Sequence, residues 1–176
     1  MAKRLTTNEF ISRSKKIHSD KYDYSLVEYK NNVTKVKIIC PIHGIFEQTP
    51  KSHIKGRGCP KCNSSKGELK IIEWLEYYNI SYEMEKTFDG LISSKGVNLR
   101  FDFFLPNHDT IIEYDGRQHF KPVKYFGGEI GLLKTQERDK IKNEWCKNNN
   151  IKIIKISYKS YESIQNIIKD ILNGSK

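Results

Sequence analysis

Four potential metal ligands in two short knuckles constrain this chain more than any other feature. Two residues separate Cys40 from His43 and Cys59 from Cys62, and fifteen residues lie between the two pairs. Ligands spaced in this way can face one ion across a tight turn, and four of them satisfy the tetrahedral coordination of structural zinc. The spacing therefore predicts a closed Zn²⁺ site made of three cysteines and one histidine.

The alternative is that these cysteines are free or form disulfides. Met1 leads into polar residues, and no apolar run approaches the roughly 18 residues of a membrane-spanning helix. We therefore expect a cytoplasmic protein with no membrane partner, in a reducing compartment that disfavours disulfides. Cys146 lies outside the zinc set, beside Trp145 in a predicted helix, where a buried apolar role is expected.

Positive charge is concentrated in the N-terminal third. The net charge is +10, and residues 1–63 carry 13 Lys and Arg against 5 Asp and Glu, so that this third holds +8. Such a surface attracts polyanions by counterion release, which favours nucleic acid, although solvated lysines are a common alternative. The residues expected to contact phosphate lie between or within the knuckles: Lys51, His53, Lys55, Arg57 and Lys61.

Two domains are expected, divided at a polar linker over residues 63–67. Residues 1–63 form a small module that buries little apolar surface, so metal binding is expected to supply much of its folding free energy. Its predicted elements are a helix over 7–18 and two strands over 36–40 and 45–48.

In residues 64–176 the apolar spacing predicts an α/β (α+β) domain with a mixed sheet flanked by helices. The expected order is helix, three strands, helix, strand, helix. The predicted ranges are 68–79, 82–88, 98–105, 110–114, 134–148, 151–158 and 160–172.

Acidic residues interrupt two of these strands. Asp102 lies within an apolar run, and Glu113 and Asp115 share one face of the next strand because side chains alternate with a period of two. Carboxylates at the ends of adjacent strands suit Mg²⁺ or Mn²⁺. The alternatives are that Asp115 serves an Asp-Gly turn and that Glu113 faces solvent.

Three segments resemble a known nuclease family. Residues 100–103 read RFDF, residues 112–120 read IEYDGRQHF, and residues 137–139 read ERD before an Ile-rich strand. Over about 66–158 the chain resembles the very-short-patch-repair (Vsr-like) endonucleases and the phage homing endonucleases with an E-D-x-H-D constellation, both of the PD-(D/E)XK superfamily. The segment from Tyr22 to Cys62 resembles a zinc-ribbon module of phage and mobile-element nucleases.

The resemblance implies roles for individual residues. Glu68 would be the helix acid, Asp102 the principal metal ligand, His119 the residue that activates water, and Asp139 its partner on a helix. Glu113 and Asp115 remain alternatives for the second metal ligand. The superfamily's strand lysine is missing because position 115 is Asp, which favours the His-containing branch, and Lys140 or Lys142 is expected to stand in.

The expected function is a metal-dependent endonuclease that hydrolyses phosphodiester bonds of double-stranded DNA. The resemblance implies a homing-type or nicking enzyme of a phage or mobile element in a bacterial or phage-infected cell, with no small-molecule cofactor. The alternative is a zinc-dependent DNA-binding protein on an inactive nuclease-like fold, which the missing lysine would explain. An RNA-directed enzyme also fits the charge, but no motif supports it.

Overall fold

The structure is a computed structural model that describes residues 5–174, and the chain divides into two compact units, Met1–Ser64 and Ser65–Lys176. Each unit has its own hydrophobic core. The predicted linker over residues 63–67 is wrong at its C-terminal end. Ser65 caps the first helix of the second unit, and Lys66 and Gly67 already belong to that helix.

The first unit opens with the predicted helix, α1 (Thr7–His18). Thr6 is its N-cap: the Glu9 amide donates to the Thr6 hydroxyl at 3.2 Å, and the Thr6 amide donates to the Glu9 carboxylate at 2.7 Å. This capping box satisfies two backbone donors that the first turn would otherwise leave free. Phe10 is fully buried on the inner face of α1.

The two predicted strands of the first unit are confirmed as β1 (Val36–Cys40) and β2 (Gly44–Gln48), which pair antiparallel as a hairpin. Two one-turn helices, α2 (Pro50–His53) and α3 (Pro60–Asn63), were not predicted. Each begins with a proline, whose missing N–H is no loss in a first turn. The buried core of the unit is largely aromatic and β-branched: Phe10, Tyr22, Tyr24, Val27, Val36 and Ile38.

The second unit is mixed α/β, and its element order is the predicted one. The elements are α4 (Lys66–Tyr77), β3 (Glu83–Lys86), β4 (Phe101–Leu105), β5 (Thr110–Asp115), α5 (Gly128–Asn148), β6 (Lys152–Ser157) and α6 (Ile164–Asn173). The strands form one sheet in the order β3-β4-β5-β6. Neighbours are antiparallel except β5 and β6, which are parallel and are joined by a crossover through α5.

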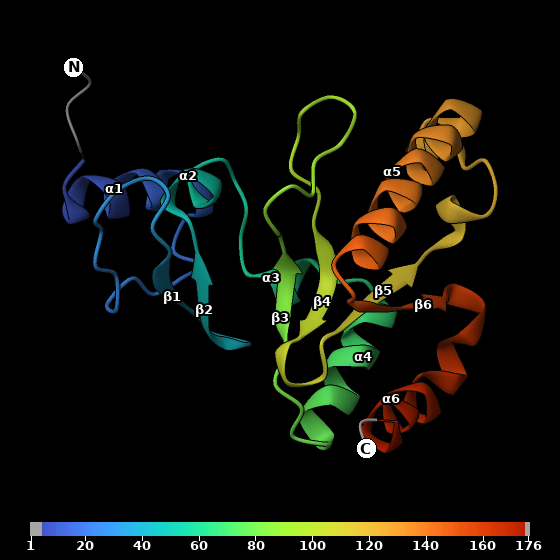
Figure 1. Cartoon of the computed structure of the whole chain (residues 1–176). Helices are drawn as coiled ribbons and strands as arrows, with labels where there is room; N and C mark the ends of the chain where they lie inside the picture. The colour runs from blue at the N-terminus through green and yellow to red at the C-terminus, as the bar shows by residue number, and fades with distance from the viewer. Residues whose placement is uncertain (1–4, 175–176) are drawn as a thin grey trace. The chain divides into compact units, whose positions relative to one another are not determined.

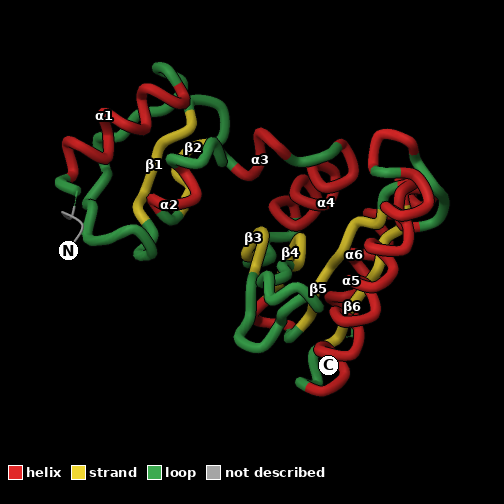
Figure 2. Tube along the Cα trace, turned by 90° about the horizontal axis from the view of Figure 1, so that it is seen from above, coloured by secondary structure: helices red, strands yellow, loops and turns green. Residues whose placement is uncertain are grey.

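Helices cover both faces of this sheet (Figures 1 and 2). On one face, residues of α4 and α6 such as Leu75 and Ile168 pack against Ile112 and Ile156. On the other face, α5 packs Ile141, Trp145 and Cys146 against Ile111 and Phe101. Cys146 is 1% exposed, which confirms its predicted burial. β5 is covered on both faces, so a charged side chain within it is held away from bulk water.

Two helix boundaries differ from the prediction. The α5 helix begins at Gly128 and not near Lys134, because Gly127 and Gly128 take positive φ angles of 89° and 60° and turn the chain directly into the helix. The last helix begins at Ile164, after a short 3-10 helix over Tyr158–Ser163. In the part of the chain that the structure describes, no helix combines the length and apolar character of a membrane span.

Candidate metal sites and the acidic cavity

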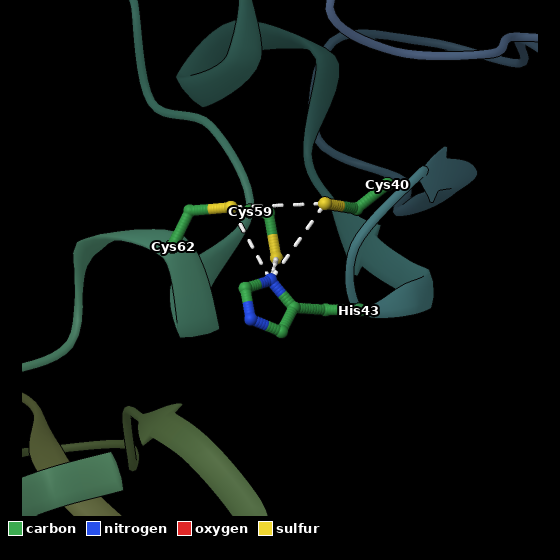
Figure 3. Close-up of side chains that lie close together, drawn as sticks. All are labelled: Cys40, His43, Cys59 and Cys62. Carbon is green, nitrogen blue, oxygen red and sulfur yellow. Dashed lines mark hydrogen bonds between the residues drawn. The ribbon is translucent and has the colours of Figure 1, made fainter.

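The four predicted zinc ligands lie together in the first unit (Figure 3). Cys40 ends β1 and His43 follows in the hairpin turn, while Cys59 precedes α3 and Cys62 lies within it. Cys40 Sγ is 3.7 Å from Cys62 Sγ, and His43 Nδ1 lies 3.7, 3.7 and 3.3 Å from the Sγ atoms of Cys40, Cys59 and Cys62. All four side chains therefore converge on one point.

These separations match a tetrahedral zinc site. With zinc–sulfur bonds near 2.3 Å and zinc–nitrogen bonds near 2.0–2.1 Å, the edges of the tetrahedron are about 3.8 Å between sulfurs and about 3.6 Å between sulfur and nitrogen. Burial raises the pKa of the Cys59 thiol to about 11, so an ion bound there displaces a proton. The cluster can hold a metal ion such as zinc, with every ligand supplied by the chain.

His53 is not a surface residue, which corrects its prediction as a phosphate contact. Its side chain is fully buried, with Nε2 3.0 Å from the Tyr24 hydroxyl and Nδ1 3.0 Å from the Arg57 carbonyl oxygen. The His18 ring stacks on it at 4.1 Å, and burial lowers the pKa of His53 to about 4. The other predicted contacts, Lys51, Lys55 and Arg57, are exposed, and Lys61 is half-buried.

In the second unit, Asp102 and Glu113 lie opposite one another where the β4–β5 ladder ends. The last paired residues are Phe103 and Ile112, so the next position on each strand carries an acid. There the Asp102 amide donates to Glu113 Oε1 at 3.2 Å, and the Tyr114 amide donates to Asp102 Oδ2 at 2.8 Å. The carboxylates thus replace the backbone acceptors that the splayed strands no longer provide.

Both carboxyl groups are shielded from water. Burial raises the pKa of Asp102 to about 7, with a further contribution from the nearby charge of Glu113. Burial also raises the pKa of Glu113, against the opposing effect of Lys142, whose ammonium lies 2.9 and 2.7 Å from the two Glu113 oxygens. Two adjacent carboxylates, of which only Glu113 contacts an ammonium, leave a net negative charge that a divalent cation can neutralise.

Lys142 reaches this pair from α5. Its side chain is 13% exposed, whereas that of Lys140 is 78% exposed and only approaches Glu144 at 4.0 Å. Of the two lysines considered from the sequence, only Lys142 touches the acids.

A second cluster of polar side chains surrounds His119, which lies in a 3-10 helix (Arg117–His119) after β5. His119 Nδ1 is 2.9 Å from Asp139 Oδ2 on α5 and 3.3 Å from Asp115 Oδ1. The buried Asp115 Oδ1 has no hydrogen-bond partner within residues 5–174, since a ring nitrogen can donate only one hydrogen and Nδ1 lies closer to Asp139. Burial opposes the imidazolium, but the two carboxylates outweigh it and raise the pKa of His119.

These contacts divide the predicted acids into two groups. Asp115, His119 and Asp139 offer ligand atoms within 4.8 Å of one another, a spacing that is also compatible with a metal ion. Glu113, and not Asp115, is the acid beside Asp102. Lys155 of β6, which the sequence analysis missed, lies 3.3 Å from Asp139 Oδ1.

The predicted site residues border one cavity of about 750 Å³ in this unit. Glu68, Asp102, Glu113, His119 and Asp139 all line it, whereas Asp115 does not. Glu68 accepts a hydrogen bond from the Ser65 hydroxyl at 2.7 Å in the first turn of α4. With Glu137, which also lines it, the cavity holds five acids and a histidine drawn from two helices, two strands and one 3-10 helix.

Comparison with known proteins assigns no activity. A family model described as "Protein of unknown function (DUF723)" matches residues 3–63. The chain is 44% identical over 62 residues to "Uncharacterized protein R892" of Acanthamoeba polyphaga mimivirus. This match covers 35% of this chain and 23% of that protein. It is 47% identical over 60 residues to "Uncharacterized protein R97" of the same virus, covering 34% of this chain and 22% of the relative.

A further relative is matched over a longer stretch. "Uncharacterized protein 033L" of Invertebrate iridescent virus 3 is 25% identical over 116 residues, or 65% of this chain and 60% of that protein. A match of that length extends beyond the first unit, which ends at Ser64. The chain covers less than a quarter of the length of the two mimivirus proteins. No solved structure matches the chain.

Proposed function

We propose that the chain is a metal-dependent endonuclease that hydrolyses phosphodiester bonds of double-stranded DNA. The observation that carries the proposal is the pair of adjacent carboxyl groups, the half-buried Asp102 and the buried Glu113, at the edge of a cavity that also holds a histidine and its acidic partner. Buried acids side by side weaken a fold unless a cation compensates them, so their presence supports a functional role.

Asp102 and Glu113 would hold the catalytic ion. Their hard oxygen atoms suit Mg²⁺ or Mn²⁺, and such an ion, when bound, polarises a phosphodiester and lowers the pKa of water. The backbone amides of Asp102 and Tyr114 fix the two carboxylates in place. Lys142 fills the place of the missing strand lysine and holds Glu113 from the opposite side.

His119 would transfer the proton of the attacking water. Asp139 fixes Nδ1 of the ring, and Nε2 makes no hydrogen bond within residues 5–174, which leaves that nitrogen to exchange a proton. The raised pKa of His119 favours the imidazolium that would form when the ring takes up this proton. Asp115 and Asp139 position and charge-stabilise the ring.

The first unit would bind DNA through exposed cations near a structural zinc ion. Lys51, Lys55 and Arg57 are exposed there, and the unit carries most of the net positive charge. The motif resemblance to Vsr-like and E-D-x-H-D homing endonucleases supports a homing-type or nicking role on phage or mobile-element DNA. It also supports a PD-(D/E)XK-like reading of the α4-to-β6 core.

The decisive experiment incubates purified zinc-loaded protein with plasmid DNA in Mg²⁺ or Mn²⁺. Wild type should cut, and Asp102→Ala and His119→Ala should lose several orders of magnitude in rate, because each removes a group that acts on the reacting water. DNA binding should survive in both variants. Asp170→Ala, an exposed acid on α6, serves as the matched control and should cut normally.

The outcome also decides between enzyme and binding protein. If wild type binds DNA and never cuts it in either metal, the catalytically inactive DNA-binding protein becomes the better description. Cleavage that persists in the Asp102 variant under matched metal and salt would refute the assigned site.

A further inference from the structure

Between β3 and β4 the chain forms an ordered projection, here called the arm (residues 91–99). Ser93 and Val97 are joined by a 2.8 Å backbone hydrogen bond, Leu91 and Leu99 by one of 2.9 Å, and Ile92 pairs with Asn98. Leu91 and Leu99 are buried at its base. Figure 1 shows this segment rising beyond the end of the sheet, next to α5 of the same unit.

The arm and α5 form two sides of the acidic cavity. Ser93, Ser94 and Lys95 line it from the arm, and Lys134, Thr135 and Arg138 line it from α5. The Asp102 and Glu113 carboxyl groups line the same cavity. A strand of nucleic acid that reaches those acids therefore passes near both sides.

Among the described residues, the exposed cations on these two sides differ from neighbouring cations in having no acidic partner. Lys86, Arg100 and Lys142 are each engaged by an acid, at 2.8, 2.8 and 2.7 Å respectively. Within residues 5–174, no ion pair or hydrogen bond involves the exposed side chains of Lys95, Lys134 or Arg138. Lys134 and Arg138 are four residues apart and therefore lie on one face of α5.

Unpaired lysines are common on protein surfaces, but here they adjoin a concentration of acid. Glu68, Asp102, Glu113, Glu137 and Asp139 all line the cavity and repel a phosphodiester. Lys142 and a divalent ion offset only part of that charge. Cations free to bind phosphate on both sides would compensate for the rest.

We propose that the second unit grips its substrate strand itself, with Lys95 of the arm and Lys134 and Arg138 of α5 binding phosphates on opposite sides of the cleaved one. This inference rests on the proposed function in taking DNA as the substrate. It adds a backbone-binding site in the second unit, independent of the basic surface of the first unit.

The first test measures affinity without cleavage. Full-length zinc-loaded protein is titrated with a labelled DNA duplex in Ca²⁺, which replaces the catalytic metal, over a series of KCl concentrations. Lys95→Ala, Lys134→Ala and Arg138→Ala should each weaken binding severalfold and reduce the slope of log affinity against log salt by about 1. Lys169→Ala removes the same charge from α6, which does not line the cavity, and should leave the slope unchanged.

The second test locates each contact on the DNA. Phosphates around the mapped cleavage position are replaced one at a time by uncharged methylphosphonates. A methylphosphonate that weakens binding to the wild-type protein should not weaken binding to the variant that lacks the side chain contacting that phosphate. The phosphate whose replacement no longer affects binding in Lys95→Ala, and the corresponding phosphate for Arg138→Ala, should lie on opposite sides of the cleaved phosphate.

The inference would be overturned if the salt slope were unchanged in all three variants. It would also be overturned if the phosphates contacted by Lys95 and Arg138 lay on the same side of the cleaved phosphate. Lys95→Gln and Lys134→Gln remove the charge but keep a long polar side chain. Circular dichroism of every variant shows whether the fold is retained. If wild type fails to cut DNA in Mg²⁺ or Mn²⁺ but the salt slopes fall as expected, the endonuclease proposal fails and phosphate binding by the second unit is supported. If wild type cuts DNA and the salt slopes do not change in the variants, the endonuclease proposal is supported and phosphate binding by these three residues is refuted.

Discussion

His119 Nδ1 lies 2.9 Å from Oδ2 of Asp139, and Lys155 approaches the other oxygen of the same carboxylate at 3.3 Å. The histidine follows β5, whereas the aspartate belongs to the crossover helix α5. The contact raises the pKa of His119 and lowers that of Asp139, although burial opposes both changes. The protonated ring is therefore stabilised by the α5 crossover.

Replacing Asp139 tests this coupling directly. Asp139→Asn removes the charge that favours the imidazolium, so the pKa of His119 should fall toward or below its ordinary value, while Asp115 maintains part of the effect. NMR titration of the His119 ring measures the shift, and single-turnover cleavage against pH should show the same displacement. Asp170→Asn is the control. An unchanged His119 titration would contradict the assigned contact.

The Lys142–Glu113 pair should contribute strongly to the stability of the second unit. Their side chains are 13% and 3% exposed, so Lys142→Met leaves a buried carboxylate without its cation. Breaking a buried ion pair from one side costs about 3–5 kcal/mol. Urea unfolding should show this loss, and adding Glu113→Gln should recover part of it. Additive losses in the double variant would indicate that the two groups do not interact.

Zinc content provides a direct test of the first unit. We expect about one zinc per chain in protein purified without chelator. Cys59→Ser should lose the ion and destabilise the unit, because metal binding supplies folding free energy. Cys146→Ser is a matched cysteine control and should keep the ion. Metal analysis that finds no zinc in wild type would rule out the site.

His53 should make the first unit sensitive to acid. Its pKa is about 4 in the fold against an ordinary 6.5, so the unfolded chain takes up a proton first as the pH falls. This contribution to stability is complete above pH 6.5 and is lost progressively between pH 6.5 and 4. His53→Gln keeps a neutral hydrogen-bonding group and should reduce the pH dependence of thermal unfolding, with the effect of the zinc ligands common to both proteins. A His53 ring that titrates near 6.5 by NMR would contradict its burial.

Gly67 should not tolerate a side chain. A Cβ atom at this position of α4 would overlap the ring of Tyr114. Alanine normally favours a helix interior by about 1 kcal/mol over glycine, whereas overpacking costs about 1–3 kcal/mol. We therefore expect Gly67→Ala to destabilise the second unit, and Gly67→Ala with Tyr114→Phe to recover little, because the clash is with the ring itself. Increased stability of Gly67→Ala would mean that the ring moves away freely.

Features encoded by local spacing could be predicted from the sequence. The two knuckles place all four sulfur and nitrogen ligands within about 25 residues, and a turn at each pair suffices to bring them together. The predicted hairpin likewise brings Asp102 near the acids of the next strand, but the sequence left Glu113 and Asp115 as alternatives, and the register of β4–β5 is what places Glu113 opposite Asp102. Alternation of side chains also gives Tyr114 to the opposite face from Glu113, where it packs against α4.

The features that were missed depend on tertiary packing. His53 lies in a basic stretch, and nothing local indicates that Tyr24 and His18 would enclose it. Lys142 and Lys140 are equivalent in sequence, and only the docking of α5 on the sheet decides which one meets Glu113.

The α5 crossover also has a consequence for the order of folding. The Asp102–Glu113 contact closes a separation of 11 residues, but the Glu113–Lys142 contact closes one of 29, and longer loops close at a greater entropic cost. We therefore expect the two acids to meet as a repelling pair before the helix docks. The neutralising ammonium would then arrive after the two acids have met. Under the proposed function, a chain whose α5 helix has not docked would lack this cation at its centre and would not yet hydrolyse DNA.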